Sequence, residues 1–181
     1  MLGLSVEQAY TVLFLLCLPV CFYVAWSDLK FMKIPNRAVI ALFAIFLVAG
    51  LAVIPFDYWI WRWLSVAVVF AIGFALYALA GWGAGDAKFA AAAAPFFAQS
   101  AADIQLALFL LAGMSLGALG AHRLLRMIPA VTRATPDWAS WTHARFPFGT
   151  ALAGTLAAYL ALKAFPAFYG WLAGLVASTS T

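Results

Sequence analysis

Long, uninterrupted apolar runs constrain this chain more than any other feature of its sequence. Three of them cover residues 8–26, 37–54 and 63–82, and each is close to the ~20 residues that a helix needs to cross a bilayer. The runs are continuous rather than alternating, which favours helices, and an isolated spanning strand would leave its backbone unpaired in lipid. With 67% hydrophobic and 9% charged residues, the sequence predicts an all-α, polytopic membrane protein with a single domain over residues 1–181.

Further along the chain, apolar runs at residues 104–121 and 147–163 predict two more crossings. A shorter segment, residues 87–102, either crosses or turns back, because its apolar part is brief and contains Pro95. The tail at residues 166–181 includes an apolar piece that is too short to predict a seventh crossing.

Positive charge decides whether residues 87–102 cross. If they do, eight of the ten Lys and Arg residues lie on one side of the membrane, and only Arg62 and Lys163 lie on the other. If they do not, the arginines of residues 122–145 move to the opposite face and the bias disappears. The positive-inside rule therefore predicts about six transmembrane helices with both termini on the periplasmic side. The net charge of +4 then reflects topology, so we expect a lipid bilayer as partner and no nucleic acid.

The start of the chain has no basic region and carries Glu7 before an apolar run that is longer than the core of a signal peptide. We therefore expect a retained first span.

Two acidic residues close two of the apolar runs. Asp28 follows the first run and Asp86 follows the third, with two predicted crossings between them. Because an even number of crossings returns the chain to the side it left, we expect both carboxylates at the same, cytoplasmic face.

Acids at a membrane boundary are costly, and their default interpretation is functional. The alternative is a local ion pair, of Asp28 with Lys30 or Lys33 and of Asp86 with Lys88. Lys30 and Lys88 either tune the acids by opposing charge or anchor the chain at the headgroups.

Two neighbouring carboxylates do not readily ionise together, so they tend to share one proton. Peptide hydrolysis uses such a pair: one carboxylate takes a proton from the attacking water, while the other polarises the scissile carbonyl and protonates the leaving amine. The sequence does not distinguish which of Asp28 and Asp86 has which role.

Turn-forming residues accompany both acids. Pro35 disfavours helix at the residue before it, and Asn36 is the predicted N-cap of the second span. Gly83 and Gly85 permit backbone angles or close approaches that a side chain would block. We therefore expect both acids to lie beside tight turns.

Taken in order, these residues resemble the type IV prepilin peptidase family, which are membrane aspartic proteases of the GxGD kind. The resemblance implies that Asp28 and Asp86 are the catalytic pair and that no metal or other cofactor is needed. It also implies a prepilin or pseudopilin substrate whose short basic leader, followed by an apolar helix, is cut just after a glycine at the cytoplasmic face of the bacterial inner membrane. The matching segments, which extend from Asp28 to about Gly154, are Asp28 with Ile34-Pro35-Asn36, Gly83-Ala84-Gly85-Asp86-Ala87-Lys88, and Pro147-Phe148-Gly149.

Bifunctional members of that family carry paired CxxC motifs in a cytosolic loop and also methylate the new amino terminus. Here the loop at residues 29–36 is short, and Cys17 and Cys21 are four positions apart within a predicted span, where we expect them to pack. The resemblance therefore implies a peptidase without methyltransferase activity, similar to the short form that serves Flp-type (tight-adherence) pili.

The predicted loop at residues 122–145 contains two histidines and two tryptophans. His122 and His143 have no Cys or acid partners at ligand spacing, so we expect no metal site. Trp138 and Trp141, close to several arginines, predict a segment at the membrane interface that either anchors to headgroups or receives substrate.

Two other functions remain as alternatives. A proton- or cation-coupled transporter needs acids along a route through the bilayer, yet no Asp or Glu lies in the middle of a predicted span. A non-catalytic scaffold for pilus assembly would have to use both acids in ion pairs.

Overall fold

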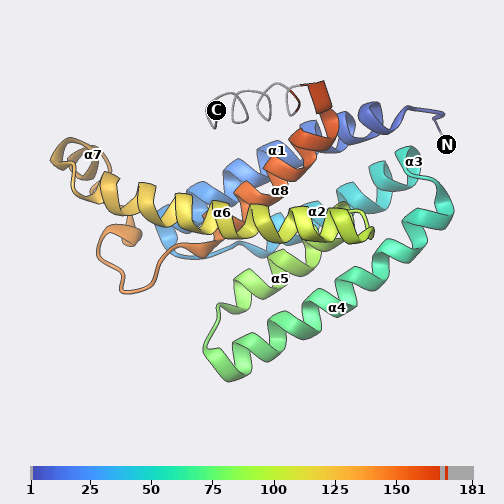
Figure 1. The fold of residues 1–181 in the computed structure, drawn as a ribbon. Helices are drawn as coiled ribbons and strands as arrows, with labels where there is room; N and C mark the ends of the chain where they lie inside the picture. Colours follow the sequence, from blue (N-terminus) through green and yellow to red (C-terminus); the bar gives the residue numbers. More distant parts are fainter. Residues whose placement is uncertain (1, 168–169, 171–181) are drawn as a thin grey trace, which may run out of the picture.

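The computed structural model describes residues 2–167 and 170, and Figure 1 shows that its helices form an elongated bundle. No strand occurs in these residues, so the predicted all-α class is confirmed. The first half comprises α1 (Val6–Phe31), α2 (Asn36–Ile45), the π-helix η1 (Phe46–Gly50), α3 (Leu51–Val53) and α4 (Phe56–Ala80). The second half comprises α5 (Ala84–Ala93), the 3-10 helix η2 (Ala94–Phe96), α6 (Ala101–Arg126), α7 (Pro129–Ala134), the 3-10 helix η3 (Ala139–Trp141) and α8 (Phe148–Ala164).

Four helical segments in the described part of the chain are long and apolar enough to cross a membrane: α1, the continuous stretch α2–η1–α3, α4 and α6. They confirm a multi-pass membrane protein. The helix α8 has 17 residues, which corresponds to about 25 Å, and α5 with η2 is shorter still. The number of six crossings and the side of the termini therefore remain predictions, and residues 168–169 and 171–181 of the tail lie outside the described part.

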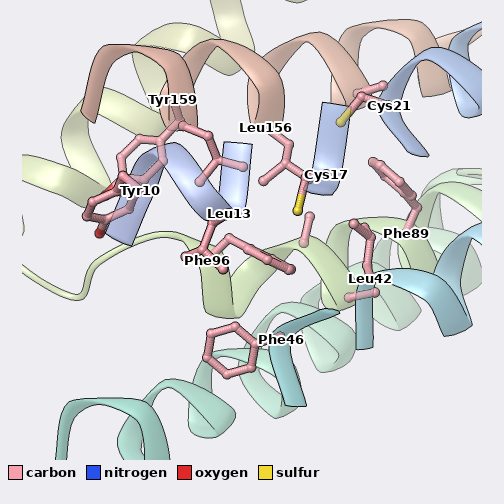
Figure 2. Packing of buried hydrophobic residues seen from close by; sticks show 14 of the residues in the cluster. Tyr10, Leu13, Cys17, Cys21, Leu42, Phe46, Phe89, Phe96, Leu156 and Tyr159 are labelled. Atoms are coloured by element: carbon pink, nitrogen blue, oxygen red, sulfur yellow. The ribbon is translucent and has the colours of Figure 1, made fainter. Parts of the chain in front are cut away.

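The core of the bundle lies where α1 runs alongside α8, with α2 and α5 packed against them. In Figure 2 the side chains of these helices meet in one apolar cluster. Cys17 is 0% exposed and Cys21 is 4% exposed, and both are free thiols within this cluster. The expectation that the two cysteines pack inside the bundle is confirmed.

The outer helices α4 and α6 carry apolar side chains that point away from the bundle, and Leu79 at the end of α4 is 87% exposed. Such surfaces suit contact with lipid chains. The helix α4 also starts earlier than the sequence predicted. The aromatic residues at 55–62 are of the kind that settle among lipid headgroups, and their sequence predicts a short connection, but Phe56 already begins the helix, with Pro55 as its N-cap. Proline tends to precede or begin helices, and no helix breaker follows it here.

The helix α5 is held tightly against α4. A Cβ atom on Gly73 of α4 would lie only 2.9 Å from the Cβ of Ala87 in α5, so the two helices approach more closely than larger residues allow. Gly81 ends α4 with a φ of 66°, a conformation that glycine adopts without strain. The remainder of α5 and η2 is largely buried in protein.

The connection between α1 and α2 is short and well fixed. Met32 ends α1 in the left-handed region, with φ at 52°, and the Ser27 hydroxyl donates a hydrogen bond to the carbonyl of Lys33 at 2.9 Å. The prediction that Asn36 is an N-cap is wrong, because Pro35 occupies that position with φ −69° and ψ 139°. Asn36 is already the first helical residue, and its side chain makes no capping bond.

Candidate active site

The carboxyl group of Asp28 lies near the end of α1 and meets the beginning of α8. Asp28 is only 5% exposed, and its Oδ2 accepts a hydrogen bond from the backbone N–H of Gly149 at 2.6 Å. Gly149 belongs to the first turn of α8, whose N-cap is Pro147. The free N–H groups and the dipole at a helix N-terminus favour a negative charge, so α8 is positioned to stabilise the anionic form of Asp28.

Gly149 is also required by the space around Asp28. A Cβ atom at this position would lie 2.8 Å from Asp28 Oδ2 and 2.9 Å from Cδ1 of Ile34. Both contacts are closer than real Cβ atoms make, so glycine is the residue that allows the carboxylate to reach the backbone of α8. The Pro147-Phe148-Gly149 segment therefore contacts Asp28, the candidate catalytic residue, directly through Gly149.

Asp86 occupies the first turn of α5 and is half-buried. Its side chain folds back over Gly83, the N-cap of α5, so closely that a Cβ on Gly83 would overlap Asp86 Oδ2. The second glycine of the motif has a looser environment. A Cβ on Gly85 would lie 3.4 Å from the Cβ of Ile34, an ordinary van der Waals contact.

Ile34 joins the two halves of the site. One side of this residue faces Gly85, next to Asp86, and the end of its side chain faces Gly149, next to Asp28. The two carboxyl groups are close enough for the charge of Asp28 to act on Asp86. The structure thus brings together two acids that are separated in the chain by the α2–η1–α3 segment and α4.

The lysines near the acids do not neutralise them. Lys30 forms a 2.7 Å ion pair with Asp137 in the loop before α8, and its hydrogen bond holds the pKa of Asp137 below the usual range. The other ion pair in the described residues joins Lys163 to Asp103. The lysines at positions 33 and 88 are exposed. The alternative in which local ion pairs explain the two acids is therefore not what the structure shows.

The loop before α8 is ordered by aromatic contacts. Trp138 stacks on Trp141 with their ring centroids 5.7 Å apart, and the indole N–H of Trp141 donates to the carbonyl of Thr135 at 3.0 Å. His122 also stacks on Trp141, with their ring centroids 5.1 Å apart. His143 accepts a hydrogen bond from the backbone N–H of Arg145. No group of three His, Cys, Asp or Glu side chains in the described residues is arranged to hold a metal ion.

Sequence reasoning did not identify the roles of Ile34, Gly149 and Asp137. The contact between Asp28 and Gly149 spans 121 positions, and no local pattern reports it. A glycine two residues after a proline, at the start of a helix, is the local signal that could have indicated a close approach there.

The fold is that of a multi-pass helical membrane protein, in which Ile34 lies between Gly85, next to Asp86, and Gly149, which donates a hydrogen bond to Asp28. The model of the type IV leader peptidase family matches residues 15–121, more than half of the 181 residues. The chain therefore belongs to the type IV leader peptidase family and is a peptidase of the membrane. Searches among curated proteins and among solved structures found no match to this chain. The family match includes both acids but ends before α8, so the role of Gly149 rests on the structure.

Proposed function

We propose that this chain is an aspartic endopeptidase that removes the leader of Flp-type prepilins and pseudopilins at the cytoplasmic face of the bacterial inner membrane. Asp28 and Asp86 would activate one water molecule between them. The observation that carries the proposal is that Ile34 packs against both Gly85, next to Asp86, and Gly149, whose backbone N–H binds Asp28. Family membership supplies the peptidase activity.

The surroundings of the two acids support different roles. Asp28 accepts a short hydrogen bond from a backbone N–H at a helix N-terminus, which stabilises a carboxylate. Asp86 lies beside that negative charge, and two like charges at close range favour one shared proton. We therefore assign Asp28 as the general base that accepts the water proton, and Asp86 as the acid that polarises the carbonyl and protonates the leaving amine.

The short connection between α1 and α2 supports a peptidase that does not methylate. Only residues 32–35 separate the two helices, and the Ser27 hydroxyl fixes this segment to the end of α1. An inserted domain with paired CxxC motifs is absent from this connection.

The experiment is coexpression of the chain with a candidate Flp prepilin, followed by intact-mass analysis of the pilin. We expect loss of the leader after a glycine, with no methyl group added to the new terminus. Asp28→Asn and Asp86→Asn should each leave an inserted, folded protein that no longer processes the prepilin. Asp57→Asn, at an exposed acid on the first turn of α4, is the matched control and should process normally.

The two aspartate variants also test the assignment of roles. Asn at position 86 keeps an N–H donor toward the carbonyl, whereas Asn at position 28 has lost the base. We therefore expect measurable residual cleavage by Asp86→Asn over long incubation and none by Asp28→Asn. Normal processing by either variant removes that residue from the mechanism, and the reverse order of residual rates overturns the roles.

A further inference from the structure

A cavity of about 860 Å³ lies at the end of the bundle opposite the two acids. It is formed by the beginning of α1, the beginning of α4, the segment after η2 and the end of α8. Tyr10 in its wall and Asp28 are 18 positions apart on the single helix α1, which corresponds to about 27 Å. That separation is close to the ~30 Å thickness of the hydrocarbon layer, so the cavity faces the other membrane surface.

Arg62 is the unusual residue of this cavity. It is 9% exposed, and its guanidinium donates only to neutral acceptors: the carbonyl oxygens of Pro95 and Phe96, both at 3.4 Å, and the Tyr10 hydroxyl at 3.2 Å. Asp57 lines the same cavity but is exposed and forms no ion pair with Arg62 within the described residues. A buried cation beside lipid without a counter-charge is costly, so an anion in the cavity would stabilise it.

A second cation faces the same space. The ammonium group of Lys163 lies 5.7 Å from the centre of the Tyr10 ring, and the guanidinium of Arg62 lies 6.0 Å from it. Lys163 pairs with Asp103 at 2.7 Å, and Asp103 also accepts a hydrogen bond from the hydroxyl of Tyr159. The acid is thus fully engaged, and the arginine remains the uncompensated charge.

The rim of the cavity suits a lipid rather than a small free anion. Tyr58 is 68% exposed and Trp61 is 66% exposed, and such aromatic residues settle at the headgroup level of a bilayer. The apolar side chains of Leu4 and Val53 line the cavity next to them. We propose that this cavity binds the phosphate group of an anionic phospholipid from the leaflet opposite the catalytic pair, with Arg62 as the principal ligand.

The test is a measurement of lipid binding by the full chain, purified in a neutral sugar detergent. Phosphatidylglycerol, diacylglycerol and inorganic phosphate are added separately, and Tm and lipid retention in native mass spectrometry are recorded. We expect phosphatidylglycerol to raise Tm and to stay bound, whereas diacylglycerol and inorganic phosphate do neither. Equal effects of phosphatidylglycerol and diacylglycerol would show that the chains alone bind, and an equal effect of inorganic phosphate would show a site for free anions. Either result overturns the proposal.

Variants locate the binding site. Arg62→Gln should abolish the shift caused by phosphatidylglycerol, whereas Arg123→Gln, at an exposed arginine in the last turn of α6, should leave it intact. Because Arg62 also bonds to η2, its replacement removes contacts that hold the bundle together, and Tyr58→Glu provides a second route that leaves these contacts in place. It places a repelling carboxylate at an exposed rim position and should weaken lipid binding about tenfold, while Tyr58→Gln should not. Unchanged binding in both Arg62→Gln and Tyr58→Glu excludes this cavity.

Discussion

Replacing Gly149 by alanine tests the central geometry of the candidate site. The added Cβ would lie 2.8 Å from Asp28 Oδ2 and 2.9 Å from the Cδ1 of Ile34. An ordinary contact begins near 3.4 Å, so the carboxyl group and the isoleucine must each move by about half an ångström or more. Gly149 sits at the start of a helix packed along α1, which leaves its backbone little freedom to yield instead.

Moving the Asp28 carboxyl group would lengthen the hydrogen bond that it accepts from the backbone N–H of Gly149. That bond is 2.6 Å long, and hydrogen bonds to charged groups contribute about 1.5–3 kcal/mol. A misplacement on the order of 1 Å in a catalytic group costs about 10²-fold in rate. We therefore expect Gly149→Ala to slow leader cleavage by about 10²-fold. Overpacking costs about 1–3 kcal/mol of stability, partly offset by the ~1 kcal/mol helix propensity gained from alanine.

The assay is the initial rate of leader removal from a purified prepilin, measured alongside Tm in the same detergent. Gly154→Ala is the matched control, since it makes the same substitution in the same helix. Its Cβ would lie 3.2 Å from the sulfur of Met114, and a flexible methionine can shift by a few tenths of an ångström. Wild-type rates for Gly149→Ala would show that contact with α8 does not position Asp28.

Three further predictions follow from the same geometry. Gly83→Ala should abolish cleavage because its Cβ would overlap the carboxylate folded over it, whereas Gly85→Ala should retain most activity, and equal loss in both would contradict this distinction. Gly73→Ala should lower stability by about 1–3 kcal/mol, seen as a lower Tm, because α4 and α5 approach too closely there for a Cβ. The pKa of Asp137 is lowered by its bond to Lys30, so this ion pair contributes above the ordinary aspartate pKa of about 3.9 and is lost as pH falls through the lowered value. Limited proteolysis of the loop before α8 should therefore increase only in strong acid, and Asp137→Asn should show the increased cleavage already at neutral pH.

The sequence was sufficient for the features that depend on local composition. Apolar runs near the length of a bilayer predicted the helices, and the crossings between Asp28 and Asp86 predicted that the two acids would face the same side. In the structure Ile34 packs against Gly85, next to Asp86, and against Gly149, which binds Asp28, and the catalytic roles of the two acids remain proposals. These inferences needed only the lengths of the apolar runs and the number of crossings between the two acids, and both can be counted in the sequence.

Other features depended on contacts that composition does not encode. Asn36 has the chemistry of an N-cap, but Pro35 adopts the extended conformation that the cap requires. The helix therefore begins at Asn36, one residue before the predicted start at Arg37. The aromatic residues after Pro55 read as an interfacial connection, yet they form the first turns of α4. In both places, proline set the helix boundary more strongly than the polarity or aromatic character of its neighbours.

The position of α8 bears on the proposal that Asp28, a buried acid at the edge of a membrane, acts as the general base. A carboxylate that is 5% exposed loses most of its hydration, and without compensation the neutral acid is favoured. No lysine pairs with Asp28 in the described residues, so the compensation comes from the backbone at the start of α8. A backbone donor carries no net charge, so it stabilises the carboxylate without forming an ion pair. A lysine in the same place would form an ion pair and reduce the basicity that water activation requires. In the proposed mechanism, a glycine at a helix start would therefore offset part of the desolvation of Asp28 without adding a cation that lowers its basicity.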